Sequence, residues 1–130
     1  MSVSYRLPAS LLASLAAVAT LSSASGAMAQ AAPSGETLFK QRCTVCHSNV
    51  AGQNKIGPSL AGVVGRKAGS APGFTAYSTP IKASGLTWTA ANLDKFLAKP
   101  AGLIPGTKMM IAVPDAAQRT ALVSYLATQK

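Results

Sequence analysis

Apolar side chains recur every three or four residues in three stretches of the chain, and this spacing predicts three helices. The first stretch begins at Ser34, a residue type that commonly caps a helix amino terminus, and has Glu36 in its first turn. The side chains that follow at helical spacing are Leu38, Phe39, Cys43 and Cys46. We therefore expect an opening helix that ends in the segment containing the two cysteines.

Two further stretches predict helices nearer the carboxyl terminus. One covers about residues 89–99 and stops at Pro100, because the residue before a proline disfavours helical geometry. Its apolar positions are Leu93, Phe96 and Leu97. The other follows Pro114, where Asp115 and Gln118 resemble a capping box. Its apolar stripe consists of Leu122, Tyr125 and Leu126.

The segments between these helices are rich in glycine and proline and are expected to be loops. Residues 78–84 are the one stretch in which a short helix is also expected. Pro80 and Gly85 interrupt the periodicity there, so the pattern predicts no more than a turn or two.

Residues 1–29 have the composition of a secretory signal peptide. Arg6 supplies a positive charge ahead of an apolar run, and an Ala-x-Ala cleavage pattern ends at Ala29. We expect cleavage after Ala29, which leaves one domain over residues 30–130. An uncleaved membrane anchor is the alternative, but the stretch after Leu21 contains Ser and Gly and is weakly apolar for a membrane span.

The charge balance is strongly basic. The chain has 12 Lys and Arg residues against 3 Asp and Glu, for a formal charge of +9. Loss of Arg6 with the signal peptide lowers this to +8. Such an excess favours partners with acidic surfaces and makes association sensitive to salt. We expect no nucleic-acid partner, because neither a basic helix nor a basic patch interleaved with aromatic residues is present.

One motif contains both cysteines and the only histidine of the chain. Residues 43–47 read Cys-Thr-Val-Cys-His, the C-x-x-C-H pattern that attaches a c-type haem. Two thiols three positions apart on a helical turn face the same way, so each can add to one vinyl group of a haem. The neutral imidazole of His47 is then the expected proximal iron ligand.

Two other sites use similar residues. Structural zinc needs four ligands, and this chain offers two Cys, one His and three acidic residues, of which only Glu36 is close by. A C-x-x-C redox disulfide normally follows a strand in a βαβ unit, and no strand pattern precedes Cys43. Covalent haem is favoured, and since bacteria attach haem to this motif outside the cytoplasm, the periplasm is the expected compartment.

The chain resembles the class I c-type cytochromes, close to mitochondrial cytochrome c and its short soluble bacterial relatives. The matching blocks are C-T-V-C-H at 43–47, G-P-S-L at 57–60, G-R-K at 65–67, A-P-G-F-T at 71–75, L-T-W at 86–88 and I-P-G-T-K-M at 104–109. The resemblance implies an all-α, small monohaem cytochrome c fold, with helices wrapped around one covalent haem c held through Cys43 and Cys46. It also implies that the first and last helices cross near Gly35, Phe39, Leu122 and Tyr125.

The resemblance nominates Met109 as the second axial ligand. Pro105 and Gly106 break any helical periodicity before it, so packing on a helix face does not account for this methionine. Met110 is the local competitor, and the resemblance implies a buried hydrophobe at that position. A thioether opposite an imidazole raises the reduction potential relative to two imidazoles, and the two ligands together close the iron to substrates.

The resemblance also assigns residues around these ligands. The carbonyl of Pro58 accepts a hydrogen bond from His47, Leu60 packs against the haem, and Thr107 forms a hydrogen bond inside the methionine loop. The haem propionates are expected to be held by Arg66, Tyr77 and Trp88. Judged from the residues alone, the alternative is that Arg66 is a solvated loop cation and that Tyr77 and Trp88 are aromatic side chains of the core.

Two positions depart from the family pattern. Phe96 stands where mitochondrial relatives carry a tyrosine that donates a hydrogen bond to the methionine sulfur. Ile81 stands where they often carry asparagine. Both changes remove polar groups from the haem pocket, which argues against the buried water associated with those groups.

These features predict a soluble periplasmic one-electron carrier, for instance of a respiratory chain, and not an enzyme. Expected partners have acidic docking surfaces and include a cytochrome bc-type complex, a terminal oxidase, a photosynthetic reaction centre or a periplasmic dehydrogenase. The carrier is expected to be a monomer.

Arg42, Lys55 and Lys108 match positions that surround the exposed haem edge in the family. The alternatives are a haem peroxidase-like enzyme, if Met109 dissociates, and a redox sensor or subunit of a fixed complex.

Overall fold

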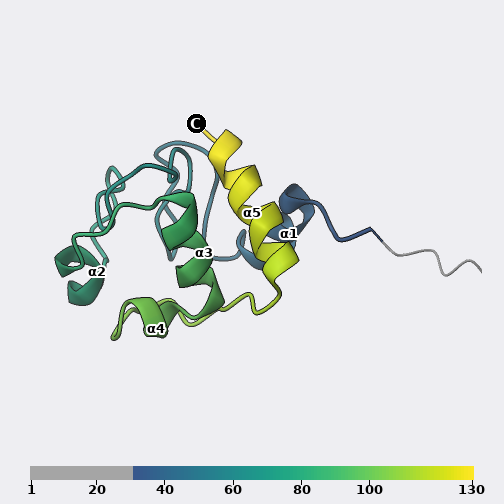
Figure 1. Ribbon diagram of the computed structural model, residues 1–130. Coiled ribbons are helices and arrows are strands. Elements are labelled where there is room, and N and C mark those ends of the chain that lie inside the picture. Colours follow the sequence, from purple (N-terminus) through teal and green to yellow (C-terminus); the bar gives the residue numbers. More distant parts are fainter. Residues whose placement is uncertain (1–30) are drawn as a thin grey trace, which may run out of the picture.

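The computed structural model describes residues 31–130, so the expected signal peptide over 1–29 and its cleavage after Ala29 lie outside the described residues. The helices are α1 (Gly35–Arg42), α2 (Thr79–Ala83), α3 (Ala90–Ala98), α4 (Pro100–Leu103) and α5 (Ala116–Thr128), as Figure 1 shows. The described part of the chain contains no strand, only an isolated antiparallel bridge between Lys67 and Thr87. The all-α class is confirmed.

The three helices predicted from periodicity are present, with their expected starts. In each of them the side chain of the N-cap residue accepts a hydrogen bond from the backbone N–H three residues later, which satisfies one of the free donors of the first turn. These N-cap residues are Ser34, Thr89 and Asp115, with N···O distances of 3.2, 3.1 and 2.7 Å.

The two short helices have different origins. The short helix expected within residues 78–84 is confirmed as α2. Helix α4 is an addition to the elements that the sequence predicts, since Pro100 by itself indicates only the end of the preceding helix. Proline also fits the first position of a helix, where its missing N–H costs nothing. The backbone N–H of Ile104 accordingly donates to the Pro100 carbonyl at 2.9 Å.

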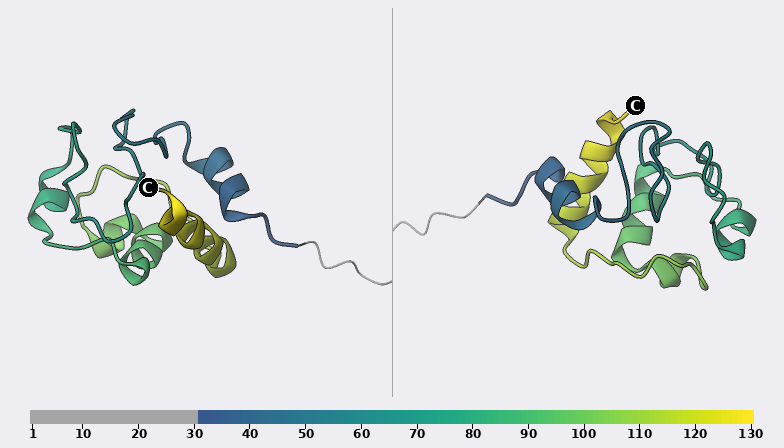
Figure 2. Two further views of the ribbon diagram at one scale, coloured as in Figure 1. Left: turned by 90° about the horizontal axis from the view of Figure 1, so that it is seen from above. Right: turned by 180° about the vertical axis from the view of Figure 1, so that it is seen from behind.

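Helices α1 and α5 cross as expected (Figure 1, and from two further sides in Figure 2). Gly35 lies at the crossing, where an added Cβ would overlap the Ala121 carbonyl and lie 2.6 Å from the Tyr125 Cβ. The rings of Phe39 and Tyr125 pack with centroids 5.5 Å apart. Leu122 on α5 is fully buried beside them. The absence of a side chain at Gly35 therefore permits the close approach of the two helices.

The hydrophobic core is formed mainly by the facing sides of α1, α3 and α5. Its helical members are Leu38, Phe39, Leu93, Phe96, Leu97, Leu122, Val123 and Leu126. In the part of the chain that the structure covers, no helix has the length and apolar character needed to cross a membrane. The long loops between α1 and α3 are placed against this core and enclose a cavity.

Candidate functional site

A cavity of about 530 Å³ separates the segment that follows α1 from helices α3 and α5. Its size is within the range of pockets that hold organic ligands, roughly 300–1,000 Å³. Most of the lining side chains are apolar, and the core helices contribute Leu93, Phe96, Leu97, Leu122 and Leu126. The cavity is therefore an opening in the hydrophobic core itself, and a large apolar group is needed to complete the packing.

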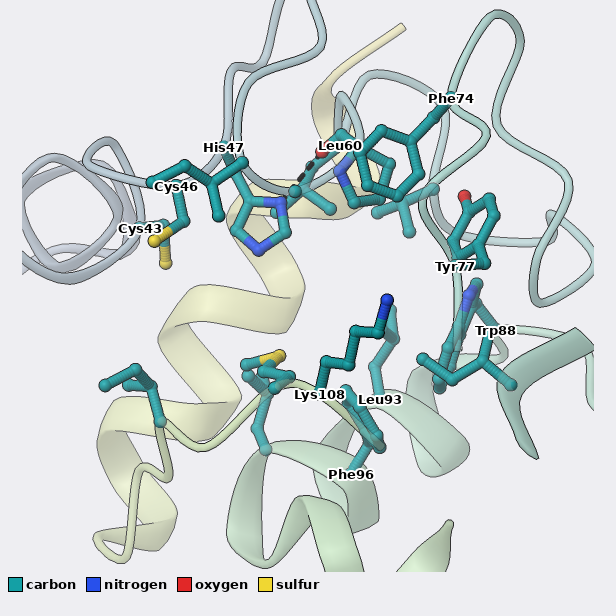
Figure 3. A pocket seen from close by; sticks show the side chains of 18 of the residues that line it. Cys43, Cys46, His47, Leu60, Phe74, Tyr77, Trp88, Leu93, Phe96 and Lys108 are labelled. Carbon is teal, nitrogen blue, oxygen red and sulfur yellow. Dashed lines mark hydrogen bonds between the residues drawn. The ribbon is translucent and has the colours of Figure 1, made fainter. Parts of the chain in front are cut away.

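The C-x-x-C-H segment lines one side of this cavity (Figure 3). Helix α1 ends at Arg42, and the chain continues in a tight turn in which the N–H groups of Cys46 and His47 both donate to the Cys43 carbonyl, at 3.0 and 2.8 Å. The turn brings both cysteines and the histidine to the cavity, as the spacing predicted. Both thiols are free. Burial raises the pKa of Cys43 to about 11, so this thiol is protonated at neutral pH.

The imidazole of His47 points into the cavity (Figure 3). Its Nδ1 lies 2.8 Å from the Pro58 carbonyl oxygen, which can only accept, so Nδ1 carries the proton and Nε2 keeps a free lone pair. Burial lowers the pKa of His47, the Pro58 hydrogen bond opposes this change, and the charge of Lys55 adds to it. A neutral imidazole with a free nitrogen inside an apolar cavity is suited to ligate a metal.

Met109 lines the same cavity from the loop between α4 and α5. The preceding turn is closed by the N–H of Thr107, which donates to the Ile104 carbonyl at 3.1 Å. The buried hydroxyl of Thr107 then accepts from the N–H of Met109 at 3.3 Å, the hydrogen bond expected inside this loop. The expectation of a buried hydrophobe at Met110 is wrong, because Met110 is 80 % exposed. Adjacent residues of a non-helical segment point in different directions, so placing the partly buried Met109 against the core leaves Met110 exposed.

Arg66 lines the cavity, and most of its guanidinium is engaged by the backbone. Nη1 donates to the Ala61 carbonyl and Nη2 to the Ser59 carbonyl, each at 2.9 Å. Nε is buried and has no hydrogen-bond partner among the described residues. Burial lowers the pKa of Arg66, and Tyr77 opposes this change, but a guanidinium stays charged. This arrangement leaves a partly desolvated cation with one buried donor unsatisfied at the cavity.

Ser78 was missed in the sequence. Its hydroxyl is buried, lacks a hydrogen-bond partner within residues 31–130, and belongs to a residue that lines the same cavity. A buried polar group without a partner costs roughly 1–3 kcal/mol. Haem carries two propionate carboxylates, and their oxygens can accept from both Arg66 and Ser78. The only signal in the sequence was a hydroxyl next to Tyr77.

The remaining expected haem contacts also lie at the cavity. The Tyr77 hydroxyl accepts from the Ala71 N–H at 3.0 Å, which leaves its own proton for a second partner. Trp88 is buried against Phe96, with ring centroids 4.9 Å apart, and Leu60 contributes to the wall. The two residues that depart from the family pattern, Phe96 and Ile81, both line the cavity as well. The wall is therefore apolar at those two positions.

Cations and exposed apolar side chains meet at the rim of the cavity. Arg42 and Lys108 are among its lining residues, and the Lys108 ammonium donates to the Ala76 carbonyl at 3.3 Å. Lys55 is not a lining residue, and its ammonium donates instead to the Thr44 carbonyl at 2.6 Å. The exposed apolar residues of the lining are Ile56, Met110 and Ile111.

The protein groups suited to metal ligation at this site are few. Across residues 31–130, no three His, Cys, Asp or Glu side chains are grouped to hold a metal ion, so a structural zinc site lacks the ligands it needs. His47 supplies one imidazole to the cavity lining, Met109 and the exposed Met110 supply two thioethers, and the two thiols lie beside the imidazole. This set fits a haem, whose porphyrin supplies the other ligands of the iron. The unpaired donors of Arg66 and Ser78 fit its carboxylates.

Comparisons with known proteins agree with this geometry. The profile of the family described as cytochrome c matches residues 32–130. Cytochrome c2 iso-2 of Magnetospirillum molischianum is 50 % identical over 102 residues, which cover 76 % of this chain and 98 % of that protein. Cytochrome c2 iso-2 of Magnetospirillum fulvum is 52 % identical over 85 residues, which cover 65 % of this chain and 88 % of that protein.

Solved structures are similar over the same region. The ferricytochrome c2 structure from Rhodopseudomonas palustris superposes with a TM-score of 0.65 at 43 % identity, covering 74 % of this chain and 96 % of that one. Cytochrome cH from Methylobacterium extorquens superposes with a TM-score of 0.66 at 42 % identity, covering 72 % of this chain and 94 % of that one.

Proposed function

This chain belongs to the cytochrome c family, and we propose that it is a periplasmic one-electron carrier whose haem iron is ligated by His47 and Met109. Membership of the family makes it an electron-transfer protein and not an enzyme, with haem c bound through Cys43 and Cys46. When bound, the haem iron is the centre that gains and loses one electron.

The observation that carries the proposal is the meeting of two ligand types in one apolar cavity. His47 enters from the C-x-x-C-H turn with Nε2 free, and Met109 borders the cavity from a loop far along the chain. His47 and Met109 would together hold the haem iron and would leave no ligand position open to a substrate. The soft thioether favours the ferrous ion, and the apolar walls penalise the additional positive charge of the ferric ion. Both effects raise the reduction potential.

Other cavity residues hold the group in one orientation. Arg66, Tyr77 and Trp88 are proposed to bind the propionates, and Ser78 is added because its buried hydroxyl lacks a partner in the described chain. The remaining positions support the axial ligands and the ring: Pro58 fixes the imidazole, Thr107 holds the Met109 backbone, and Leu60 packs against the porphyrin. Rigid ligands limit rearrangement when the electron is exchanged.

The rim of the cavity suits a transient partner. Arg42 and Lys108 provide positive charge beside Ile56 and Met110, which are 77 % and 80 % exposed. Charges steer the encounter with an acidic surface, while exposed apolar side chains give short-range contact. The proposed partners are redox proteins with acidic docking surfaces, such as a cytochrome bc-type complex, a terminal oxidase, a photosynthetic reaction centre or a periplasmic dehydrogenase, met by a monomeric carrier.

Export completes the proposal. Residues 1–29 are proposed to be a signal peptide cleaved after Ala29, which leaves the domain over residues 30–130. The support is the charge, apolar run and Ala-x-Ala pattern of that segment, together with a haem motif whose attachment takes place outside the bacterial cytoplasm. Sequencing the amino terminus of the periplasmic protein tests the cleavage position.

The purified mature protein tests the function. The expected results are a pigment that resists extraction by acidified acetone, a weak long-wavelength ferric absorption band from sulfur–iron bonding, and slow binding of cyanide. Rapid cyanide binding would support the peroxidase-like alternative, since it reports an open iron position. Gel filtration of the native protein distinguishes a free carrier from a subunit of a fixed complex, which would elute at the size of that complex.

A further inference from the structure

The loop that presents Met109 has few attachments of its own. It runs from α4 to α5 (Figure 1), and its first turn is closed by the hydrogen bonds of Thr107. From residue 108 to residue 112, the backbone forms no hydrogen bond with other backbone groups of the described chain. The position of Met109 therefore depends on how firmly the two ends of this stretch are held.

The far end is held at Val113 and Pro114. The N–H of Val113 donates to the Leu97 carbonyl at 2.7 Å, and Val113 itself is 1 % exposed. The two carbonyls of this end are held by one side chain from α5, because Nη1 of Arg119 lies 3.0 Å from the Val113 oxygen and 2.6 Å from the Pro114 oxygen.

The same guanidinium reaches a second helix. Nε of Arg119 donates to Oδ1 of Asp94 on α3 at 2.8 Å. The Arg119 side chain is only 13 % exposed, whereas that of Asp94 is 45 % exposed. One partly buried cation thus connects α3, α5 and the end of the methionine loop.

We propose that Arg119 is a positioning residue for Met109, which keeps the thioether at the iron by fixing the carboxyl end of its loop. The inference rests on the proposed ligation by Met109. Hydrogen bonds from a charged guanidinium are stronger than those from a neutral donor. Removal of Arg119 leaves the Val113 and Pro114 carbonyls without this donor. Without them the loop from residue 108 to residue 114 is retained at its far end mainly by Val113. The free energy needed to detach Met109 from the iron is then smaller.

The role of the carbonyl contacts can be separated from that of the ion pair. The Asp94 side chain is 45 % exposed, so solvent screens its charge and weakens its attraction to Arg119. Asp94→Asn removes the carboxylate charge but leaves Arg119 able to bind both carbonyls. Arg119→Lys retains the charge but replaces a planar fork by a single ammonium, which cannot reproduce all three contacts.

The test measures how easily imidazole displaces Met109 in the ferric holoprotein. We expect Arg119→Ala to increase the apparent affinity for imidazole by about tenfold, because a larger fraction of molecules has an open iron position. The sulfur–iron absorption band should weaken in parallel. Arg119→Lys should give an intermediate increase, and Asp94→Asn little change. Lys40→Ala is the matched control, since it also removes a cation from an ion pair, with Glu36 on α1.

Global unfolding by denaturant is measured on the same proteins. If Arg119 only joins α3 to α5, Arg119→Ala and Arg119→Lys will lower the free energy of unfolding while the imidazole affinity and the band stay as in the unaltered protein, and the inference is overturned. If the unaltered protein itself lacks the sulfur–iron band, Met109 is not a ligand, and both this inference and the proposed ligation fail. Should Arg119→Ala yield no holoprotein, Arg119→Lys gives the decisive comparison.

Discussion

Nδ1 of His47 lies 2.8 Å from the carbonyl oxygen of Pro58, and this hydrogen bond determines which imidazole nitrogen faces the cavity. The carbonyl holds the proton on Nδ1 and leaves Nε2 as the only nitrogen with a free lone pair. The adjacent Gly57 contributes to the same arrangement by lacking a side chain. The histidine side of the site therefore combines three features: the imidazole of His47, the acceptor carbonyl of Pro58 and the space that Gly57 leaves for the ring.

Gly57→Ala is expected to displace the imidazole. An added Cβ would lie 2.7 Å from Nδ1 of His47, which is shorter than the nonbonded contacts that a Cβ atom makes in proteins. We expect the free energy of unfolding of the holoprotein to fall by roughly 1–3 kcal/mol, as for other overpacked sites. Guanidinium unfolding followed by haem absorbance measures it. Gly102→Ala is the control, because the three atoms nearest to a Cβ there, at 3.0 to 3.3 Å, belong to the Lys99 side chain. Equal effects at both glycines would contradict the tight fit at His47.

Arg66→Gln is expected to lower the reduction potential. The positive charge of Arg66 beside the cavity raises the free energy of the ferric state relative to the ferrous state. Removing this charge therefore stabilises the ferric state. An effect on the order of 50 mV follows for one charge at a partly screened distance. A spectroscopic redox titration measures the change. Lys67→Gln removes the same charge from an exposed neighbour that does not line the cavity, and a fall of the same size there would show that Arg66 acts only through net charge.

Lys108→Glu is expected to slow electron exchange with an anionic oxidant. Lys108 lines the cavity mouth, so reversing its charge weakens the attraction of an anion to the point where the electron leaves. Stopped-flow oxidation of the ferrous protein by ferricyanide should slow roughly twofold to fivefold at low salt and much less at high salt. Lys95→Glu makes the same change on α3 outside the cavity lining. If both variants slow equally, the mouth is not the preferred point of approach.

Local patterns in the sequence predicted what depends on local interactions. Helices α1, α3 and α5 followed from apolar spacing, supported for α1 and α5 by capping residues at Ser34 and Asp115, because both features act within a few residues. Helix α4 could not be found in this way, since its four residues make only about one turn, too few for an apolar spacing to repeat, and its first residue is a proline. The crossing of α1 and α5 came from the family resemblance and not from periodicity.

The residues of the site were likewise predictable only where they form a local sequence motif. The C-x-x-C-H motif is contiguous, so its arrangement at the cavity could be read from spacing. The buried hydroxyl of Ser78, the backbone contacts of Arg66 and the exposure of Met110 depend on the path of irregular loops, which have no repeating geometry. No residue type or period reports such contacts, because they are fixed only when the loops close over the cavity. For the same reason Arg119 carried no signal of its contacts with Val113 and Pro114.

Ligation of the iron by Met109 is tested by a redox titration of the unaltered holoprotein beside Met109→Ala and Met110→Ala. The unaltered protein should show a single reversible one-electron transition. Met109→Ala should lower the midpoint potential by on the order of 100 mV or more, because axial ligands are the strongest control of a haem potential, and Met110→Ala should leave it nearly unchanged. An unchanged midpoint in Met109→Ala, or an equal fall in Met110→Ala, would contradict the proposed ligation.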